Sequence, residues 1–232
     1  MLCYHADMCG RYVIKTLTQA IIDAFEAVLP PMPELFPRYN VAPSQPVPVV
    51  RTAADGRRHL DMLRWGLIPS WAKDAKAQPQ PINVRAETVE HRPMFRAPFQ
   101  RRRCLMAADG FYEWQPTGPK AKRPFYIHRK DDAPFAFAAI WDTWDKGGGS
   151  IESCALLTTT PNDLMKPIHG RMPVILRRED YARWLDPQTP RSELVSLLVP
   201  FANDALDAYP VSTAVNSPPN DGPECIRPDR EA

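Results

Sequence analysis

Apolar residues recur at helical spacing in only a few short stretches of this chain. The clearest stretch is 16–29, which predicts a helix that starts with a capping box formed by Thr16 and Gln19. The Pro-Pro pair that follows cannot continue this helix. Shorter helical patterns occupy 180–185 and 192–199. The apolar positions of the first helix are Leu17, Ala20, Ile21, Ala24, Phe25, Val28 and Leu29.

Short apolar runs bounded by turn residues make up most of the remaining chain and predict strands. Asp55-Gly56 predicts a tight hairpin turn, and the glycine run 147–149 predicts a looser one. From Ser217 onward the chain is rich in proline and poor in apolar residues, which predicts irregular structure. The predicted strands are 47–52, 60–67, 104–108, 124–129, 135–141, 154–159 and 174–176.

Many short strands and few helices, without regular alternation, predict an α+β fold. We expect a single domain built on mainly antiparallel β-sheets with a few peripheral helices. The 232 residues are enough for one well-packed core, and no internal repeat or linker divides them. We expect the domain to span 8–227, with an N-terminal extension at 1–7 that is absent from the mature protein and a tail at 228–232.

Charge and cysteine content exclude several classes of protein. The net charge of +2 is too small to indicate nucleic-acid binding by itself, so a phosphate-binding surface needs local clustering. The five cysteines, an odd number without a C-x-x-C pair, argue against a disulfide framework and a cysteine zinc site. The first seven residues lack the basic and apolar regions of a signal peptide, and no apolar run is long enough to predict a membrane span.

Cys9 directly follows a methionine near the start of the chain. If Met8 is removed, Cys9 carries a free α-amine and a thiol on adjacent carbons. Such an aminothiol condenses with an aldehyde to an imine, and the thiol then closes a thiazolidine ring. The alternative is a small buried thiol of the kind most cysteines provide.

Two further stretches carry candidate binding residues. Asn83, Arg85 and Glu87 stand at alternate positions, so an extended segment would project all three to one face. That face is either the floor of a site or a solvated strand surface. Trp65 and Trp71 flank a Gly/Pro turn, and they either pack in the core or offer a stacking surface for an unpaired base.

A cationic stretch spans 91–103 without an acidic residue. It is either a solvated basic loop or a track for phosphate groups. Phenylalanines at 95 and 99 are interleaved with its cations. The cationic positions are His91, Arg92, Arg96, Arg101, Arg102 and Arg103.

Glu113 stands among aromatic residues directly after the most apolar predicted strand. Aromatic surroundings would desolvate the carboxylate and raise its pKa into the range of general acid–base catalysis. The alternative is an exposed glutamate at a strand end. His169 and Arg171 lie in a loop bounded by Gly and Pro, where a histidine is exposed more often than catalytic, and where Arg171 would suit an anionic group.

Taken in order, these motifs resemble the SOS-response-associated peptidase family, the abasic-site-processing proteins of bacteria and eukaryotes. The resemblance covers the chain from Met8 to about Arg227. No single motif would be specific, but six in the same order are. They read Met-Cys-Gly-Arg-Tyr, Arg-Tyr-Asn-Val-Ala-Pro, Trp-Gly-Leu-Ile-Pro, Ile-Asn-Val-Arg-Ala-Glu-Thr, Gly-Phe-Tyr-Glu-Trp and His-Gly-Arg-Met-Pro.

The resemblance implies a catalytic role for four residues. Cys9 would be the covalent nucleophile, and Asn83 would position its amine and the sugar. Glu113 would shuttle protons, and His169 would help to open the deoxyribose ring. The positions that the resemblance implies for DNA binding are Arg11, Arg38, Asn40, Trp71, Arg85 and Arg171.

The implied function is recognition of abasic sites in single-stranded DNA and formation of a covalent thiazolidine crosslink through Cys9. Self-removal of the preceding residues would be peptidase chemistry. No metal, cofactor or protein partner is implied, and we expect a monomer, cytoplasmic and associated with the nucleoid if the source is bacterial. Two alternatives stay open: a cysteine peptidase acting on other proteins, with a Cys9 thiolate and His169 as base, and a non-catalytic binder of single-stranded DNA.

Two positions depart from the family pattern. Seven residues precede Met8, where the family normally begins at that methionine. Ala72 follows Trp71, where some relatives carry a second bulky aromatic residue. The second departure concerns the stacking surface and not the chemistry.

Overall fold

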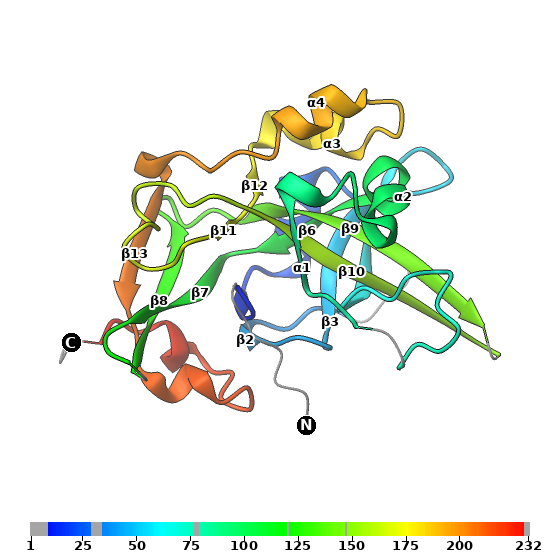
Figure 1. Ribbon diagram of the computed structural model, residues 1–232. Coiled ribbons are helices and arrows are strands. Elements are labelled where there is room, and N and C mark those ends of the chain that lie inside the picture. The colour runs from blue at the N-terminus through cyan, green and yellow to red at the C-terminus, as the bar shows by residue number, and fades with distance from the viewer. Residues whose placement is uncertain (1–8, 29–33, 77–78, 120, 147, 230–232) are drawn as a thin grey trace.

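The smaller of two β-sheets carries the segment that follows Cys9. The computed structural model describes residues 9–28, 34–76, 79–119, 121–146 and 148–229 (Figure 1). Within these residues five strands pair antiparallel in the order β13-β8-β7-β1-β2. They are β1 (Tyr12–Ile14), β2 (Arg38–Val41), β7 (Gly110–Pro116), β8 (Lys122–Arg129) and β13 (Leu206–Pro210).

The larger sheet has eight strands in the described part of the chain. Because β10 pairs with both β9 and β4, the order β4-β3-β6-β9-β10 returns to its start and closes a small barrel. The pairings of β10 with β4 and β5 are parallel, and the others are antiparallel. The strands are β3 (Pro46–Thr52), β4 (Arg58–Trp65), β5 (Asn83–Arg85), β6 (Arg103–Ala108), β9 (Phe135–Lys146), β10 (Gly149–Thr159), β11 (Met172–Pro173) and β12 (Ile175–Leu176).

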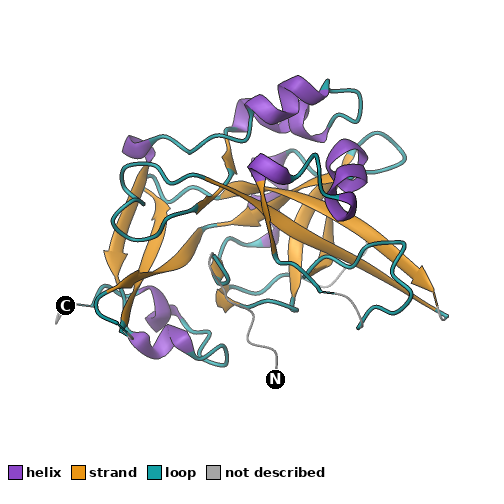
Figure 2. Cartoon of the chain, viewed as in Figure 1, coloured by secondary structure: helices purple, strands orange, loops and turns teal. Residues whose placement is uncertain are grey.

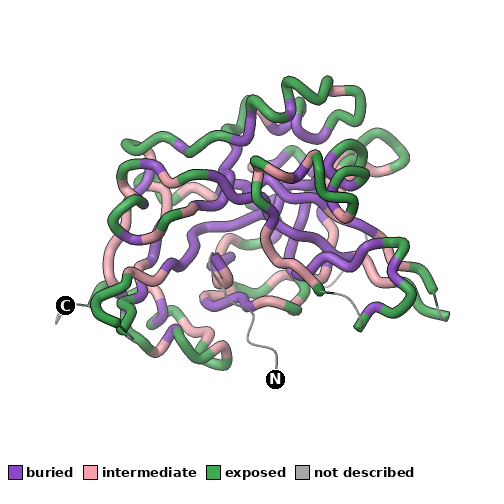
Figure 3. Tube along the Cα trace, in the orientation of Figure 1, coloured by how far each residue is buried: buried purple, intermediate pink, exposed green. Residues whose placement is uncertain are grey.

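Aromatic residues join the smaller sheet to the barrel. The ring of Tyr12 meets Trp65 and Phe137 edge-on, with centroids 5.6 and 6.1 Å apart. Phe111 meets Phe137 in the same way at 5.9 Å. Edge-to-face pairs add roughly 0.5–1.5 kcal/mol each to the burial of apolar area. Figure 3 shows the buried positions concentrated along these central strands, so β1 and β7 are fixed on a rigid base.

Helices and 3₁₀ turns surround the strands (Figure 2). None of the helices in the described ranges has the length and apolar character needed to cross a membrane. The structure confirms the predicted α+β fold with mainly antiparallel sheets. The helices are α1 (Thr18–Phe25), α2 (Pro93–Arg101), α3 (Tyr181–Leu185) and α4 (Arg191–Ser196), and the turns are η1 (Ala86–Thr88), η2 (Arg178–Asp180), η3 (Asn203–Ala205), η4 (Thr213–Asn216) and η5 (Pro223–Ile226).

The first helix is shorter than its apolar pattern predicts, and the predicted capping box is wrong. The hydroxyl and the backbone N–H of Thr16 both donate to the buried carboxylate of Asp109, so Thr16 does not cap the helix. Glu26 ends α1 in the left-handed region with φ of 52°. Val28 then forms a bridge with His59 on β4, and the Pro-Pro pair lies outside the described residues.

The cationic stretch 91–103 folds mostly into helix α2, which the apolar pattern did not predict. Phe95 and Phe99 point into the core, 7% and 2% exposed, so neither is available to stack on bases. Arg103 is 4% exposed and binds backbone at the ends of α2 and α3, where helices leave carbonyl groups unpaired. Its guanidinium donates to the carbonyl oxygens of Phe99, Gln100, Trp184 and Asp186.

Candidate active site

Three strands and one loop bring the four predicted catalytic residues together. Cys9 directly precedes β1, which pairs with β7, the strand of Glu113. The amide Nδ2 of Asn83, on β5, donates to the carbonyl oxygen of Cys9 at 3.0 Å. His169 lies in the loop between β10 and β11, and its Nδ1 is 3.9 Å from Oε1 of Glu113. Residues spread over 160 positions of sequence thus surround one cysteine.

Glu113 has the buried carboxylate that its aromatic neighbours predict. It is 3% exposed, and burial raises its pKa from 4.5 to about 8, against backbone hydrogen bonds from Cys9 and Trp114 that favour the charged form. Oε1 has no hydrogen-bond partner in the described ranges. A carboxyl group with this pKa can both take and give a proton near neutral pH.

The motif glycine that precedes Glu113 is required by packing. Gly110 lies against the ring of Tyr126 on the neighbouring strand, and a Cβ there would clash with that ring. The absence of a side chain therefore leaves room for the Tyr126 ring against β7.

The thiol of Cys9 is fully buried in the 232-residue chain. Burial, and then the nearby charge of Glu113, raises its pKa well above the usual value. The Sγ atom makes one long contact, 3.6 Å to the carbonyl oxygen of Arg11, which only weakly opposes these effects. A thiolate is therefore disfavoured at this position.

The predicted alternation of Asn83, Arg85 and Glu87 ends after Arg85. Asn83 and Arg85 lie on β5, but Glu87 belongs to the 3₁₀ turn η1. Arg85 is exposed and its side chain is available to a ligand. The carboxylate of Glu87 instead binds the guanidinium of Arg171 at 2.6 and 2.9 Å.

Asn40, predicted to bind DNA, is fully buried and binds the C-terminal segment 211–229. Its Nδ2 donates to the carbonyl oxygens of Val215, Ser217 and Asn220, at 2.8 to 3.1 Å. Its Oδ1 accepts from Arg11 at 3.3 Å. Asn40 therefore has no exposed side-chain group with which to contact DNA, and its role in the structure is to hold this segment.

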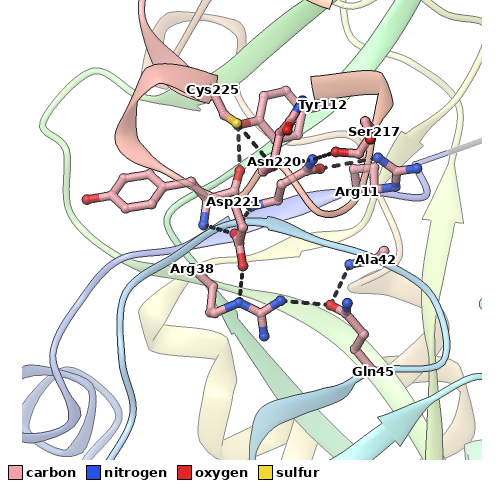
Figure 4. A network of polar contacts seen from close by, with 11 residues as sticks. Arg11, Arg38, Ala42, Gln45, Tyr112, Ser217, Asn220, Asp221 and Cys225 are labelled. Atoms are coloured by element: carbon pink, nitrogen blue, oxygen red, sulfur yellow. Dashed lines mark hydrogen bonds and ion pairs between the residues drawn. The ribbon is translucent and has the colours of Figure 1, made fainter. Parts of the chain in front are cut away.

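Arg11 and Arg38 bind the same segment. Arg11 Nη1 donates to the carbonyl oxygen of Val215 at 2.9 Å. Arg38 pairs with Asp221, whose carboxylate also accepts the N–H groups of Tyr39 and Asn40 at 2.6 Å (Figure 4). The segment predicted to be irregular thus lacks long elements but is tightly bound. Contact with DNA stays a prediction for both arginines.

Trp71, predicted to bind DNA, has an exposed side chain, at 53%. Its loop is braced by β9. The N–H of Ser70 donates to the buried carboxylate of Asp142 at 2.9 Å, and Lys146 Nζ donates to the carbonyl oxygen of Trp71 at 3.1 Å. A fixed backbone beneath an exposed indole suits a stacking surface.

Ala72 departs from some relatives but fits its surroundings here. It is fully buried in a small cluster packed by Trp144, whose indole N–H donates to the carbonyl oxygen of Ala72 at 2.9 Å. Trp65 is also fully buried, so the core interpretation holds for this tryptophan. Of the two tryptophans around the predicted turn, Trp71 alone is exposed.

Sequence reasoning missed the residues that support this site. Asp142 stands between two tryptophans in a strand, an unusual place for a charge and the one signal of its role. The C-terminal segment gave no signal, because its contacts with Asn40 and Arg11 are backbone carbonyl groups and its Asp221 carboxylate meets a distant part of the sequence. In the described ranges no group of three or more His, Cys, Asp and Glu side chains is placed to hold a metal ion.

Comparisons with protein families, individual proteins and solved structures each find matches over most of this chain. The model of the family described as SOS response associated peptidase (SRAP) matches residues 8–218. The abasic site processing protein YoqW of Bacillus subtilis is 45% identical over 222 residues, covering 94% of this chain and 99% of that protein. The abasic site processing protein YedK of Escherichia coli is 32% identical over 227 residues, covering 95% and 100%. A crystal structure of a protein from Bacteroides thetaiotaomicron matches with a TM-score of 0.85 at 28% identity, covering 95% of this chain and 100% of that one.

Proposed function

The chain belongs to the SOS response associated peptidase family, and we propose that it processes abasic sites in DNA as part of the response to DNA damage. Relatives that it matches over nearly their whole length carry the name abasic site processing protein. One hydrogen bond in the site gives the strongest support for this proposal. The backbone nitrogen of Cys9, which becomes an α-amine once Met8 is removed, is hydrogen-bonded to the carboxylate of Glu113.

The proposed reaction begins with ring opening. An abasic deoxyribose interconverts between a closed hemiacetal and an open aldehyde. His169 gives a proton to the ring oxygen as the bond from C1′ to that oxygen breaks, and the C1′ hydroxyl loses its proton. The product is the aldehyde that an amine can attack.

The amine and thiol of Cys9 then act in turn. The amine attacks C1′, and Glu113 carries two protons in turn from the nitrogen to the former aldehyde oxygen, which first becomes a hydroxyl and then leaves as water, so an imine forms. The thiol adds to the imine carbon, its proton moves to the nitrogen, and a thiazolidine closes. Because no free imine remains, β-elimination and strand breakage are suppressed.

The raised pKa of the Cys9 thiol favours a reaction in which the amine attacks first over a peptidase mechanism that needs a thiolate. Catalytic cysteine thiolates have lowered pKa values, but burial raises the pKa of the Cys9 thiol. An amine that attacks first needs no thiolate. We propose that the Glu113 carboxylate also assists cleavage of the peptide bond that precedes Cys9; its hydrogen bond to the Cys9 nitrogen supports self-processing rather than cleavage of other proteins.

We propose single-stranded DNA as the substrate, because a duplex would first have to be unpaired. The exposed side chains of Trp71 and Arg85 would contact a base and a phosphate group. We also propose that the protein acts as a monomer without a cofactor and, if its source is bacterial, on DNA of the nucleoid.

The experiment compares proteins that begin at Met1 and at Met8, by intact mass and by denaturing gel with abasic and intact oligonucleotides. We expect the protein that begins at Met8 to lose one methionine and to form a detergent-resistant band with abasic DNA alone. A non-catalytic binder gives no such band. A protein that keeps all residues before Cys9 yet forms the same heat-stable adduct would refute the α-amine mechanism.

A further inference from the structure

The loop that carries His169 is attached to the site at both of its ends. Within the loop, the backbone N–H groups of Ile168 and His169 both donate to the carbonyl oxygen of Met165 at 2.8 Å. Beyond this turn, side chains from β7, η1 and β10 hold the loop. Those attachments determine where the imidazole lies relative to Glu113.

Gln115 holds the first end. Its Nε2 donates to the carbonyl oxygen of Pro167 at 2.9 Å. Gln115 is two residues after Glu113 on β7, and side chains two apart on a strand share a face. The strand that carries the carboxylate thus also holds the loop that carries the imidazole.

The Glu87–Arg171 ion pair holds the other end. Besides its two bonds to Glu87, Arg171 Nη2 donates to the carbonyl oxygen of Thr158 on β10 at 2.7 Å. The N–H of Arg171 in turn donates to Nδ1 of His169 at 3.2 Å. The hydrogen bonds from Arg171 are the largest cause of the lowered pKa of Glu87, which keeps this carboxylate charged.

These contacts also bear on the predicted DNA contact of Arg171. Its side chain is 16% exposed, and its terminal nitrogens already bind Glu87 and Thr158. A phosphate group would have to displace the carboxylate of Glu87 to gain the same bidentate geometry. The arrangement suits a guanidinium that holds backbone in place better than one that awaits a ligand.

We propose that Gln115 and the Glu87–Arg171 pair are positioning residues that hold His169 beside Glu113. The inference rests on the proposed function, in which these two groups move protons on one sugar. The distance of 3.9 Å between His169 Nδ1 and Glu113 Oε1 leaves the pair just beyond hydrogen-bond length. A further displacement of about 1 Å would be expected to cost up to roughly 10²-fold in rate.

The test uses Gln115→Glu and Glu87→Gln, in protein that begins at Met8. Gln115→Glu keeps the shape of the side chain, but a carboxylate cannot donate to the Pro167 carbonyl. Glu87→Gln removes the charge that holds Arg171. Glu90→Gln is the matched control, because Glu90 pairs with Arg191 on α4, outside this loop. Circular dichroism checks that each variant is folded.

We expect both test variants to crosslink abasic DNA roughly 10- to 100-fold more slowly at saturating DNA. Affinity for intact single-stranded DNA should not fall, and Glu90→Gln should react as wild type. A second readout needs no reaction: the imidazole resonances of His169 in NMR spectra should shift or broaden in both test variants.

The outcomes separate the inference from the proposed function. Wild-type rates together with unchanged His169 resonances in the test variants would overturn the inference. A wild-type protein that never crosslinks abasic DNA would refute the proposed function, while the resonances would still test the loop. Lysine keeps the charge of Arg171 but cannot form two parallel hydrogen bonds with Glu87, so wild-type crosslinking by Arg171→Lys would overturn the positioning role of the pair.

Discussion

The side-chain amide of Asn83 donates a hydrogen bond of 3.0 Å to the carbonyl oxygen of Cys9. Asn83 thereby ties the barrel strand β5 to the residue that precedes β1 of the smaller sheet. Glu113 binds the nitrogen of the same cysteine from β7. The two contacts fix both backbone polar groups of Cys9. The nitrogen that would become the amine once Met8 is removed is therefore oriented before any substrate binds.

Glu113→Gln should slow adduct formation by roughly 10²-fold, the scale of losing a general acid–base group. It should also change how stability depends on pH. Between its unfolded pKa of 4.5 and its folded pKa of about 8, the folded protein keeps a proton that the unfolded chain releases. The stability contributed by this group is therefore full below pH 4.5 and is lost as pH rises toward 8.

Glutamine stays neutral at every pH, so the variant does not lose this stability as pH rises. In wild type this loss amounts to a few kcal/mol, at about 1.4 kcal/mol per unit of pKa shift. The melting temperature of Glu113→Gln relative to wild type should therefore be higher at pH 9 than at pH 5. A difference that is the same at both pH values would show that the carboxylate is not desolvated in the folded protein.

Cys9→Ser separates the two nucleophiles of the proposed mechanism. Serine keeps the α-amine, but its hydroxyl closes a less stable oxazolidine ring. We expect an imine that borohydride traps and little adduct without the reductant, whereas Cys9→Ala should behave in the same way under borohydride and give no stable ring. Cys104→Ala is the control, since this core cysteine should leave the adduct intact. A stable adduct in Cys9→Ala would contradict the thiazolidine.

Asp142→Ala should weaken binding of single-stranded DNA by releasing the Trp71 loop. It removes the acceptor of the Ser70 N–H and the partner of Arg102, 3.2 Å away. Stacking on an aromatic residue contributes about 1–3 kcal/mol per base, so Trp71→Ala should lose roughly 5- to 150-fold in affinity. If Asp142 acts through Trp71, the double variant should bind no more weakly than Trp71→Ala. Additive losses would place Asp142 in a separate role.

Arg85→Ala should reduce the slope of log affinity against log salt by about one unit, the signature of one lost phosphate contact. The measurement uses intact single-stranded DNA, so that crosslinking does not intervene. Arg57, exposed in the hairpin turn after β3 and paired with Asp55, offers a matched control that should leave the slope unchanged. An unchanged slope in Arg85→Ala would place this arginine away from the DNA backbone.

Asn40→Ala should destabilise the protein by about 2–4 kcal/mol, because it leaves buried carbonyl groups of the C-terminal segment without a donor. Thermal or urea unfolding measures the change, and Gln188→Ala, at an exposed position, should stay within about 0.5 kcal/mol of wild type. Stability equal to wild type together with weaker DNA binding would restore the predicted DNA contact.

The sequence by itself determined the strands and the identity of the reacting residues. Apolar runs and turn residues are local signals, so the seven predicted strands fall on β3, β4, β6, β8, β9, β10 and β12, and the Asp55-Gly56 turn was correct. At their shared hairpin, β9 and β10 each extend five residues beyond the predicted ends. The aromatic neighbours of Glu113 were enough to predict its raised pKa, because they adjoin it along the chain. Short strands such as β1, β2 and β5 were not predicted, since three or four residues carry too little pattern. The longer strands β7, which carries Glu113, and β13 were also missed.

Only the tertiary structure decided what each polar side chain binds. The partner of Arg38 is Asp221, 183 positions away, and Arg11 reaches the carbonyl oxygen of Val215 across 204 positions. A guanidinium suits a phosphate, a carboxylate or a backbone carbonyl equally well in sequence, and which of these it meets depends on the folded chain. Arg103 and Phe95 give a second example. Their stretch was predicted to be a solvated basic loop or a track for phosphate groups, but the fold buries both side chains.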